Sequence, residues 1–242
     1  MTSSGESTWV LDVSVATRAS LEPLRNLGRA VEMRRYMKDV SPFLGVSAPD
    51  RRKALRAGWR GIPTPSSSEL GTAAIALSQM DEREYHYAAY DLIAEWIDVA
   101  DEDFLSTFGA QLLTSTPWWD SVDGLVSAMV SPLCLRFGHS ELIDEWSNSG
   151  DRWLIRAAIG HQRGWKSRTD IDRICELAHE HWRDGEFFIA KAIGWGLRDC
   201  ARLNTARIER FVVEHLSPNP VAVREIRKGL ATAHRRRGVR HQ

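Results

Sequence analysis

A tryptophan and an aspartate four residues apart are the strongest candidates for chemistry in this sequence. Pro117 suits the first turn of a helix, and Trp119 and Asp123 then lie on one face of that helix. The alternative is that the ring fills the core and the carboxylate is solvated, which is common for both residue types. Because adjacent helical residues point about 100° apart, we expect only one of Trp118 and Trp119 to enter the core.

Two basic residues in mostly apolar helical segments are the second candidate. Arg156 and Lys191 occupy the predicted helices Trp153–Ile159 and Phe187–Leu197, and a cation there must reach water or an anion. One interpretation is a long side chain that extends to solvent or forms a salt bridge. The other is contact with a phosphate, for which arginine offers a bidentate fork. Trp195 and Arg198 extend the same face.

These side chains need a scaffold, and the sequence predicts an all-helical one. Strand signals are nearly absent, and apolar residues recur at intervals of three and four, as they do from Tyr85 to Ile97. Short breaks separate segments of ordinary helix length, which favours antiparallel neighbours. The breaks fall at 41–42, 61–68, 115–117, 147–150, 183–185 and 217–220.

A weak internal repeat indicates how the helices are arranged. Ile159 and Ile193 lie 34 residues apart in similar surroundings. An all-helical repeat of this length is typical of helix pairs stacked in a solenoid, with one helix of each pair lining a concave surface. Asp123, Arg156 and Trp195 fall near one register of the repeat, so we expect them along one face.

Composition fits an ordinary globular domain. Hydrophobic residues make up 43% and charged residues 26% of the 242 residues. No apolar run approaches the ~20 residues of a membrane span, and the polar start lacks the pattern of a secretory signal. We therefore expect one cytoplasmic domain over 1–242, with a disordered tail at 1–7 and a basic tail at 235–242. Three cysteines without a CxxC pair are expected to be reduced packing residues: Cys134, Cys175 and Cys200.

Charge is unevenly distributed along the chain. The formal net charge is zero, with 32 basic and 32 acidic residues. From Arg224 to Gln242 there are seven basic residues and one acid, a net charge of +6 that leaves −6 on the rest. A basic end of this kind binds polyanions or is simply solvated, and the sequence is compatible with both.

Five segments between Met33 and Leu230 follow the order seen in one known family. They are Tyr36–Lys38 with Pro42–Val46 and Pro49–Arg52, then Arg83–Ala89, Trp118–Asp123, Trp153–Ile159 and Phe187–Arg198. Together they resemble the AlkD family of bacterial DNA glycosylases. No segment is decisive alone, but five in the right order are specific. Ile155 and Ala190 depart from the pattern, because basic or polar residues are expected there.

The resemblance implies HEAT-like helical repeats that form an α-α superhelix with a basic concave groove for duplex DNA. It also implies hydrolysis of the N-glycosidic bond of 3-alkyladenine and 7-alkylguanine, without full base flipping and with room for bulky adducts. The catalytic carboxylate of the family falls on Asp123 and its catalytic-site arginine on Arg156. Its groove aromatics fall on Trp119 and Trp195. DNA-binding roles fall on Tyr36, Lys38, Lys191 and Arg198.

The implied chemistry needs no metal and no cofactor. An N-alkylated purine is already a cationic leaving group, so it does not require a general acid. Positive charge builds on the deoxyribose, where the carboxylate of Asp123 would stabilise it and orient or deprotonate the attacking water. Trp119 and Trp195 would pack on the backbone of the strand, and Arg156 would hold a phosphate. We expect a monomer that binds alkylated double-stranded DNA and no membrane.

Two other functions fit the same pattern of helices. A catalytically silent relative would bind distorted DNA by shape and backbone contacts, although the carboxylate at Asp123 argues against it. A protein-interaction scaffold is the common use of helical repeats, but it does not require this cluster of tryptophan, aspartate and arginine. Within the glycosylase hypothesis, these residues fit both general repair and the self-resistance of a producer of DNA-alkylating antibiotics.

Overall fold

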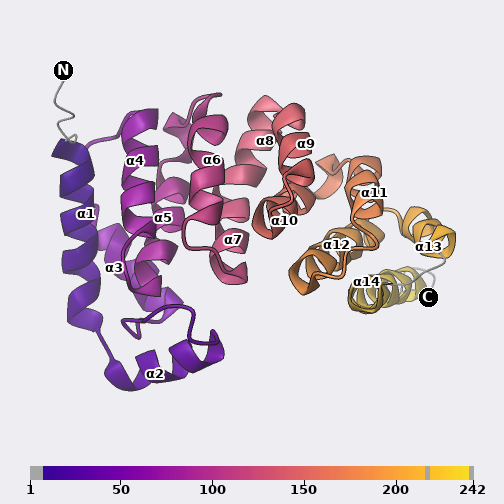
Figure 1. Ribbon diagram of the computed structural model, residues 1–242, viewed down its shortest axis with the longest axis horizontal. Helices are drawn as coiled ribbons and strands as arrows, with labels where there is room; N and C mark the ends of the chain where they lie inside the picture. The colour runs from indigo at the N-terminus through magenta and orange to yellow at the C-terminus, as the bar shows by residue number, and fades with distance from the viewer. Residues whose placement is uncertain (1–7, 216–218, 240–242) are drawn as a thin grey trace. The chain divides into compact units, whose positions relative to one another are not determined.

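The predicted all-helical fold is confirmed. A computed structural model describes residues 8–215 and 219–239, with side chains up to residue 235, and these residues contain helices and no strand (Figure 1). Contacts divide the chain into two compact units, Met1–Leu133 and Cys134–Gln242. The predicted N-terminal tail and residues 240–242 lie outside the described part.

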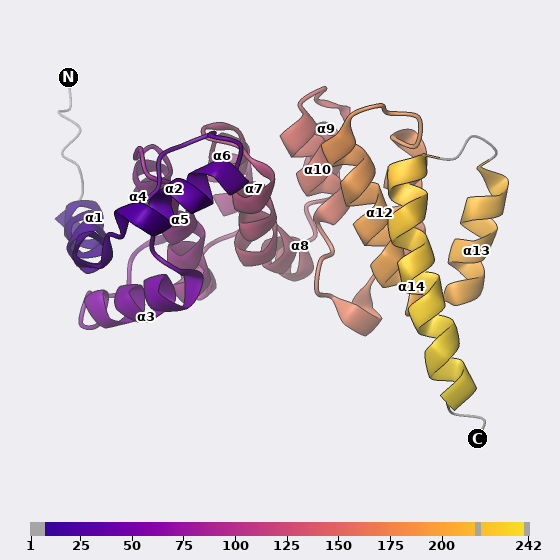
Figure 2. The same cartoon turned by 90° about the horizontal axis from the view of Figure 1, so that it is seen from below.

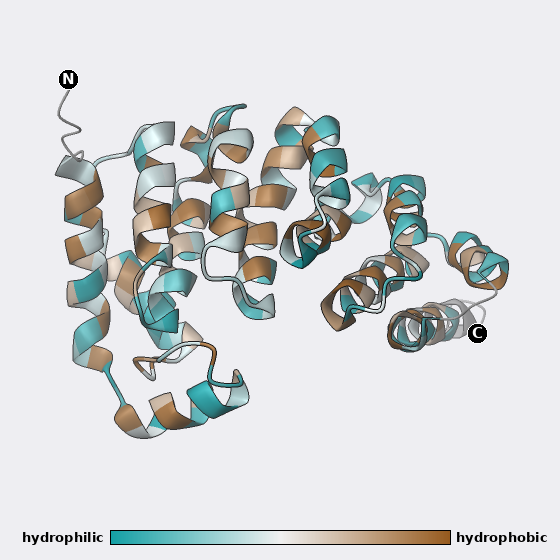
Figure 3. Ribbon diagram, viewed as in Figure 1, coloured by the Kyte–Doolittle hydropathy of each residue, from teal (hydrophilic) through white to brown (hydrophobic). Residues whose placement is uncertain are grey.

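The first unit consists of short helices and one inserted loop between α2 and α3. Helices α4 and α5 pack against each other, and α1 contacts both α3 and α4. Figure 3 shows that apolar and polar residues alternate around these helices, as expected for helices with one buried face. The elements are α1 (Thr8–Leu21), η1 (Glu22–Leu24), α2 (Leu27–Tyr36), α3 (Ala48–Gly58), α4 (Ser67–Ser78), α5 (Arg83–Glu95), η2 (Ile97–Val99), α6 (Phe104–Thr114), α7 (Trp119–Leu125), the π-helical η3 (Val126–Val130) and the start of α8 (Ser131–Phe137).

Local polar side chains determine where several of these helices begin. The side chain of Asn26 accepts a hydrogen bond from the amide of Arg29 at 2.9 Å, which caps α2. Helix α4 begins with a capping box, in which the Ser66 hydroxyl and the Glu69 carboxylate accept from each other's amides. Of these two caps, Ser66 falls at a predicted break, 61–68, whereas Asn26 lies at a helix start that the sequence analysis did not predict.

The apolar loop between α2 and α3 is fixed by a buried carboxylate. Glu84 on α5 accepts hydrogen bonds from the amides of Leu44, Gly45 and Val46 at 2.9, 2.8 and 2.9 Å. Gly45 has a φ of +85°, and a Cβ there would lie 2.1 Å from the carbonyl oxygen of Asn26. Only glycine therefore fits, and the loop is a packed part of the unit.

The second unit pairs helices in the register that the sequence repeat predicts. Arg152 and Glu186, which are 34 residues apart, form an ion pair, and so do Lys191 and Glu225 at the same separation. Helices α12 and α14 lie side by side in Figure 2. The elements are the end of α8, α9 (Ser140–Asn148), α10 (Arg152–Gly160), η4 (Lys166–Arg168), α11 (Ile171–Glu180), α12 (Phe187–Ala201), α13 (Thr205–Glu214) and α14 (Pro220–Val239).

Two further sequence expectations can be compared with the described residues. All three cysteines are buried and unbonded to one another, as expected for packing residues. Burial raises the pKa of Cys134 and Cys200 to about 12, which keeps these thiols protonated. No helix in the described ranges is long and apolar enough to cross a membrane.

Candidate functional site

The first unit holds Trp119 and Asp123 on α7, four residues apart as predicted. Both side chains are half-buried. The ring of Trp119 packs against a small core cluster formed by Met37, Phe43 and Tyr87. Trp118 packs against the same cluster, so the expectation that only one of the two tryptophans joins the core is wrong. The reason is that Trp118 precedes the helix: its backbone is extended at the N-cap (φ −150°, ψ 162°), so the angle of about 100° between adjacent helical residues does not apply to this pair.

Helix α7 is attached to α5 through an arginine that the sequence analysis did not single out. The guanidinium of Arg83 is 1% exposed and forms an ion pair with Asp120, with Nη2 to Oδ1 at 2.6 Å and Nε to Oδ2 at 3.3 Å. It also donates to the Ser121 hydroxyl at 2.9 Å and to the Thr116 carbonyl at 2.9 Å. Tyr87 donates from its hydroxyl to Asp120. The first turn of α7 is thus held from one side by buried polar contacts.

A histidine completes the set of acceptors around this guanidinium. Nη1 of Arg83 lies 3.2 Å from Nδ1 of His86, which must accept, so His86 is neutral and donates from Nε2 to the carbonyl of Met80. Burial lowers the pKa of His86, and the nearby charge of Arg83 acts in the same direction. Each donor of the guanidinium therefore has an acceptor within the unit.

A second contact fixes the middle of α7. A Cβ on Gly124 would lie 2.4 Å from the ring of Tyr90, so only glycine allows this close approach of α7 to α5. The hydroxyl of Tyr90 accepts from Arg51 at 3.2 Å, and Arg51 in turn pairs with Asp91 at 2.9 Å. Asp123 lies between these two attachments.

The second unit gathers three of the predicted residues around the indole ring of a fourth, Trp195. Arg156 lies 5.1 Å from the ring centroid of Trp195, Lys191 5.7 Å and Arg198 5.9 Å. Arg163, which the sequence analysis did not consider, lies 5.8 Å from it. Cations within about 6 Å of an indole face are attracted by its quadrupole. The predicted face of α12 is therefore present: Lys191 and Arg198 both lie beside the ring of Trp195.

Arg156 is the most enclosed of these cations. It is 2% exposed and donates from Nη1 to the carbonyl oxygen of Phe188 at 2.6 Å. This contact joins α10 to α12 across a separation of 32 residues. The side chain thus supports the ring of Trp195 from within the unit.

Lys191 and Arg198 share a carboxylate that sequence reasoning missed. Glu225 on α14 accepts from Lys191 at 2.9 Å, from Arg198 at 3.2 Å and from Lys228 at 3.0 Å, and its side chain is only 4% exposed. The hydrogen bond from Lys191 and then that from Lys228, together with the charges of these two lysines, lower the pKa of Glu225 to about 2 despite the opposing effect of burial. A signal was present, because Glu225 is the one acid in the basic segment from Arg224 to Gln242.

Tyr36 and Lys38 lie at the end of α2 in the first unit. Tyr36 is 73% exposed, and Lys38 is exposed with a φ of +60°. Met37 between them points into the cluster that Trp119 contacts. The two predicted DNA-binding residues therefore flank the buried cluster beneath Trp119 and present their own side chains to solvent.

A strongly basic segment of the first unit was also overlooked. Between Arg29 and Arg60 there are nine basic residues and three acids, a net charge of +6. On α3 and the turn after it, Lys53, Arg56 and Arg60 share one exposed face at helical spacing. These three have no ion-pair partner among the described residues. The zero net charge of the chain therefore conceals two cationic segments.

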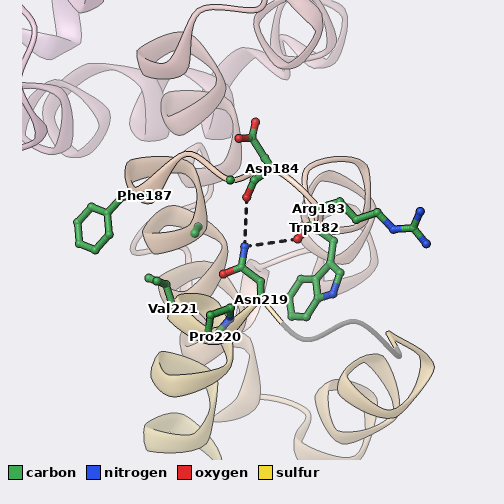
Figure 4. A pocket seen from close by; sticks show the side chains of 9 residues that line it. Trp182, Arg183, Asp184, Phe187, Asn219, Pro220 and Val221 are labelled. Atoms are coloured by element: carbon green, nitrogen blue, oxygen red, sulfur yellow. Dashed lines mark hydrogen bonds between the residues drawn. The ribbon is translucent and has the colours of Figure 1, made fainter.

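A pocket of about 400 Å³ opens at the start of α12 and α14, and none of the eight predicted residues lines it (Figure 4). The amide nitrogen of Asn219 donates to the carbonyls of Trp182 and Asp184 at 3.4 Å, and its amide oxygen accepts from Ala222. The amide of Asn219, which lines this pocket, is thus already hydrogen-bonded within the protein. The lining residues are Trp182, Arg183, Asp184, Gly185, Phe187, Ala190, Asn219, Pro220 and Val221.

Comparison with known proteins agrees with the fold. No curated protein matches the sequence. In the described ranges, no cluster of three or more side chains that could bind a metal occurs. A solved structure described as a predicted DNA alkylation repair enzyme from Enterococcus faecalis is 30% identical, with a TM-score of 0.78 over 86% of this chain and 97% of that one. The family model of the DNA alkylation repair enzymes matches residues 17–230. The chain therefore belongs to the DNA alkylation repair enzyme family.

Proposed function

We propose that the protein is a monofunctional DNA glycosylase that hydrolyses the N-glycosidic bond of cationic alkylated purines in duplex DNA, with Asp123 as its catalytic carboxylate. The observation that carries the proposal is the placement of Asp123. Its carboxylate shares a face of α7 with the half-buried ring of Trp119, and the helix is attached to α5 on both sides of it. A carboxylate on a fixed element can meet a developing positive charge without reorganising.

The chemistry follows from the leaving group. In a 7-alkylguanine or 3-alkyladenine nucleotide the purine already carries a positive charge. When the bond from C1′ to the purine nitrogen breaks, its electron pair moves to the purine, which leaves as a neutral base. The positive charge passes to the sugar, where the carboxylate of Asp123 would stabilise it more than it stabilises the ground state. Water then adds at C1′ and gives its proton to the carboxylate or to solvent, which leaves an abasic site.

The basic residues of both units support DNA as the substrate. In the second unit Trp195 offers an indole face surrounded by cations, which suits packing against a sugar-phosphate strand. In the first unit the exposed face of Lys53, Arg56 and Arg60 suits contacts with phosphates. Tyr36 and Lys38 are also exposed beside the cluster under Trp119. An alkylated duplex is therefore the proposed partner, and the protein is proposed to act as a monomer.

The direct test is the release of 7-methylguanine from a duplex, measured under single-turnover conditions for the parent protein and Asp123→Asn. The substitution keeps the shape of the side chain and removes its charge, so we expect release to fall by at least a hundredfold, a typical loss for one electrostatic group. Duplex affinity should stay within about threefold. Asp103→Asn is the matched control, because Asp103 is an exposed acid at the start of α6 whose side chain makes no capping bond.

Other outcomes would change the proposal in defined ways. Release that is unchanged in Asp123→Asn would remove this residue from the catalytic role. A parent protein that binds the alkylated duplex but releases neither 7-methylguanine, 3-methyladenine nor a bulky 7-alkylguanine would be a silent binder. Absence of binding as well would leave a protein-interaction scaffold. Release of the bulky base at a rate near that of the methylated base would support catalysis without full base flipping.

A further inference from the structure

The polar contacts of α7 are more extensive than the stability of a seven-residue helix requires. Arg83 and Asp120 form a buried ion pair, and such pairs stabilise a fold little compared with apolar residues of similar size, because both charges lose their hydration. Their better-supported effect is to select one geometry among several. What this pair selects is the position of the first turn of α7.

We infer that Arg83 is a positioning residue, which acts through Asp120 and Ser121 to set the direction in which Asp123 presents its carboxylate. This inference rests on the proposed function. Asp123 follows Asp120 by three residues, which is less than one turn, so a rotation of the first turn moves its carboxylate directly. Movement of a catalytic group by about 1 Å can cost a hundredfold in rate.

The planar fork of arginine is what makes this arrangement specific. Its three nitrogens reach a carboxylate, a hydroxyl, a backbone carbonyl and an imidazole at once, at distances of 2.6 to 3.3 Å. A lysine ammonium carries the same charge with only three donors from one point, so it cannot reproduce this pattern. The hydroxyl of Tyr87 adds one more contact to Asp120, on the side of the carboxylate that faces α5.

The opposite end of α7 limits where the helix can move. Gly124 rests on the ring of Tyr90, and a π-helical turn, Val126–Val130, follows directly. A π-helical turn changes the direction of side chains relative to a regular helix, and such turns are frequent at functional sites. With the far end fixed in this way, loss of the Arg83 contacts would tilt the first turn of α7 and leave the rest of the unit folded.

A graded series of variants tests the inference: Tyr87→Phe, Asp120→Asn and Arg83→Lys. The first removes a single hydroxyl, the second removes the charge of the acceptor, and the third keeps the charge but removes the fork. We expect single-turnover release of 7-methylguanine to fall by a few fold, about tenfold and at least tenfold, in that order, with duplex affinity unchanged within about twofold. Amide hydrogen exchange in α7 should rise in the same order, at temperatures well below unfolding.

The matched control loses stability at a site unrelated to α7. Thr17 is fully buried on α1, where its hydroxyl accepts from the indole of Trp59 at 2.9 Å. Thr17→Val removes this acceptor and should lower the unfolding temperature while leaving the release rate at 25 °C unchanged. If Arg83→Lys and Asp120→Asn lower only the unfolding temperature, as this control does, Arg83 is structural and the inference is overturned.

The result for the parent protein separates the two hypotheses. An active parent together with fully active Arg83 and Asp120 variants overturns the inference alone. An inactive parent overturns the proposed function and, with it, the positioning role. Because Tyr87→Phe leaves the ring in the core cluster, this variant keeps the test available even if the charged variants fail to fold.

Discussion

At the scale of single residues, one carboxylate, that of Glu225, binds several of the cations near Trp195. Glu225 accepts hydrogen bonds from Lys191, Arg198 and Lys228, and this acceptor set leaves a net charge of +2. The carboxylate therefore orders the lysine and arginine side chains beside the indole without neutralising the surface. A phosphate approaching Trp195 would find cations whose positions are already fixed, which lowers the entropy lost on binding.

Removal of this carboxylate gives a prediction with a defined pH dependence. Because the pKa of Glu225 is lowered to about 2 from the ordinary value of about 4.3, its stabilising effect is fully present above about pH 5 and is lost as pH falls toward 2. We expect Glu225→Gln to lower the free energy of unfolding by about 1–3 kcal/mol at pH 7, because its partners can still reach water. Urea unfolding at pH 7 and pH 3.5 measures this difference, which should be smaller at pH 3.5.

Glu214→Gln serves as the comparison, because Glu214 is an exposed acid at the end of α13. Its effect should stay within about 0.5 kcal/mol at both pH values. A Glu225→Gln variant as stable as the parent at pH 7 would show that the cations around Trp195 are held by other contacts.

At the scale of helices, the sequence predicted which segments are helical but not which polar side chains meet. Apolar spacing and capping residues are local, and they correctly gave helices over Trp153–Ile159 and Phe187–Leu197 within α10 and α12. The pairing of Arg83 with Asp120 joins residues 37 apart, and that of Lys191 with Glu225 joins residues 34 apart. Such pairs depend on how two helices rotate against each other, which side-chain spacing within one helix does not determine.

The candidate site shows the same limit. Spacing placed Trp119 and Asp123 on one face and Trp195 and Arg198 on another, but the burial of each side chain depends on neighbours from distant segments. Arg156 is an example, because it is 2% exposed and donates to a backbone carbonyl of α12, that of Phe188. The sequence left a salt bridge, solvent and phosphate open for this residue, and it did not suggest a backbone carbonyl.

The basic face of α3 gives a prediction that belongs to a whole helix. Each phosphate that a protein contacts contributes about 0.9 to the slope of log affinity against log salt concentration. We expect the triple variant Lys53→Gln, Arg56→Gln and Arg60→Gln to reduce this slope by about 2 to 3 for an undamaged duplex. The measurement is fluorescence anisotropy between about 50 and 200 mM salt, a range over which such contacts weaken binding strongly.

The control removes the same charge from arginines that already have carboxylate partners. Arg152, Arg202 and Arg207 pair with Glu186, Asp199 and Asp172 at 3.4, 3.6 and 2.8 Å. Their triple glutamine variant should change the slope by less than 1, since their charge is compensated locally. Equal losses in the two triple variants would mean that total charge, and not the face of α3, determines DNA affinity.

At the scale of the whole molecule, zero net charge is the sum of opposite regions. The segments Arg29–Arg60 and Arg224–Gln242 each carry +6, which leaves −12 on the remaining residues. The two segments hold 16 of the 32 basic residues but only 4 of the 32 acids, so the distribution of charge says more about nucleic-acid binding than the sum does. The contacts divide the chain into two compact units. The expectation of a single domain over 1–242 stays a prediction.

Buried histidines predict how the stability of the whole chain depends on pH. Burial lowers the pKa of His161 to about 4 and also lowers that of His86, and both values lie below the 6.5 of an unfolded chain. The unfolded chain therefore binds more protons below pH 6.5, so stability is highest above that pH and falls as pH decreases toward 4. His161 is 5% exposed, and its contribution to this loss is on the order of 2–3 kcal/mol by pH 4.

His161→Gln should therefore lose less free energy of unfolding than the parent between pH 6.5 and 5, a window above the titration of Glu225. Equal curves for the parent and His161→Gln would show that the imidazole of His161 gains a proton in the folded protein as readily as in the unfolded chain.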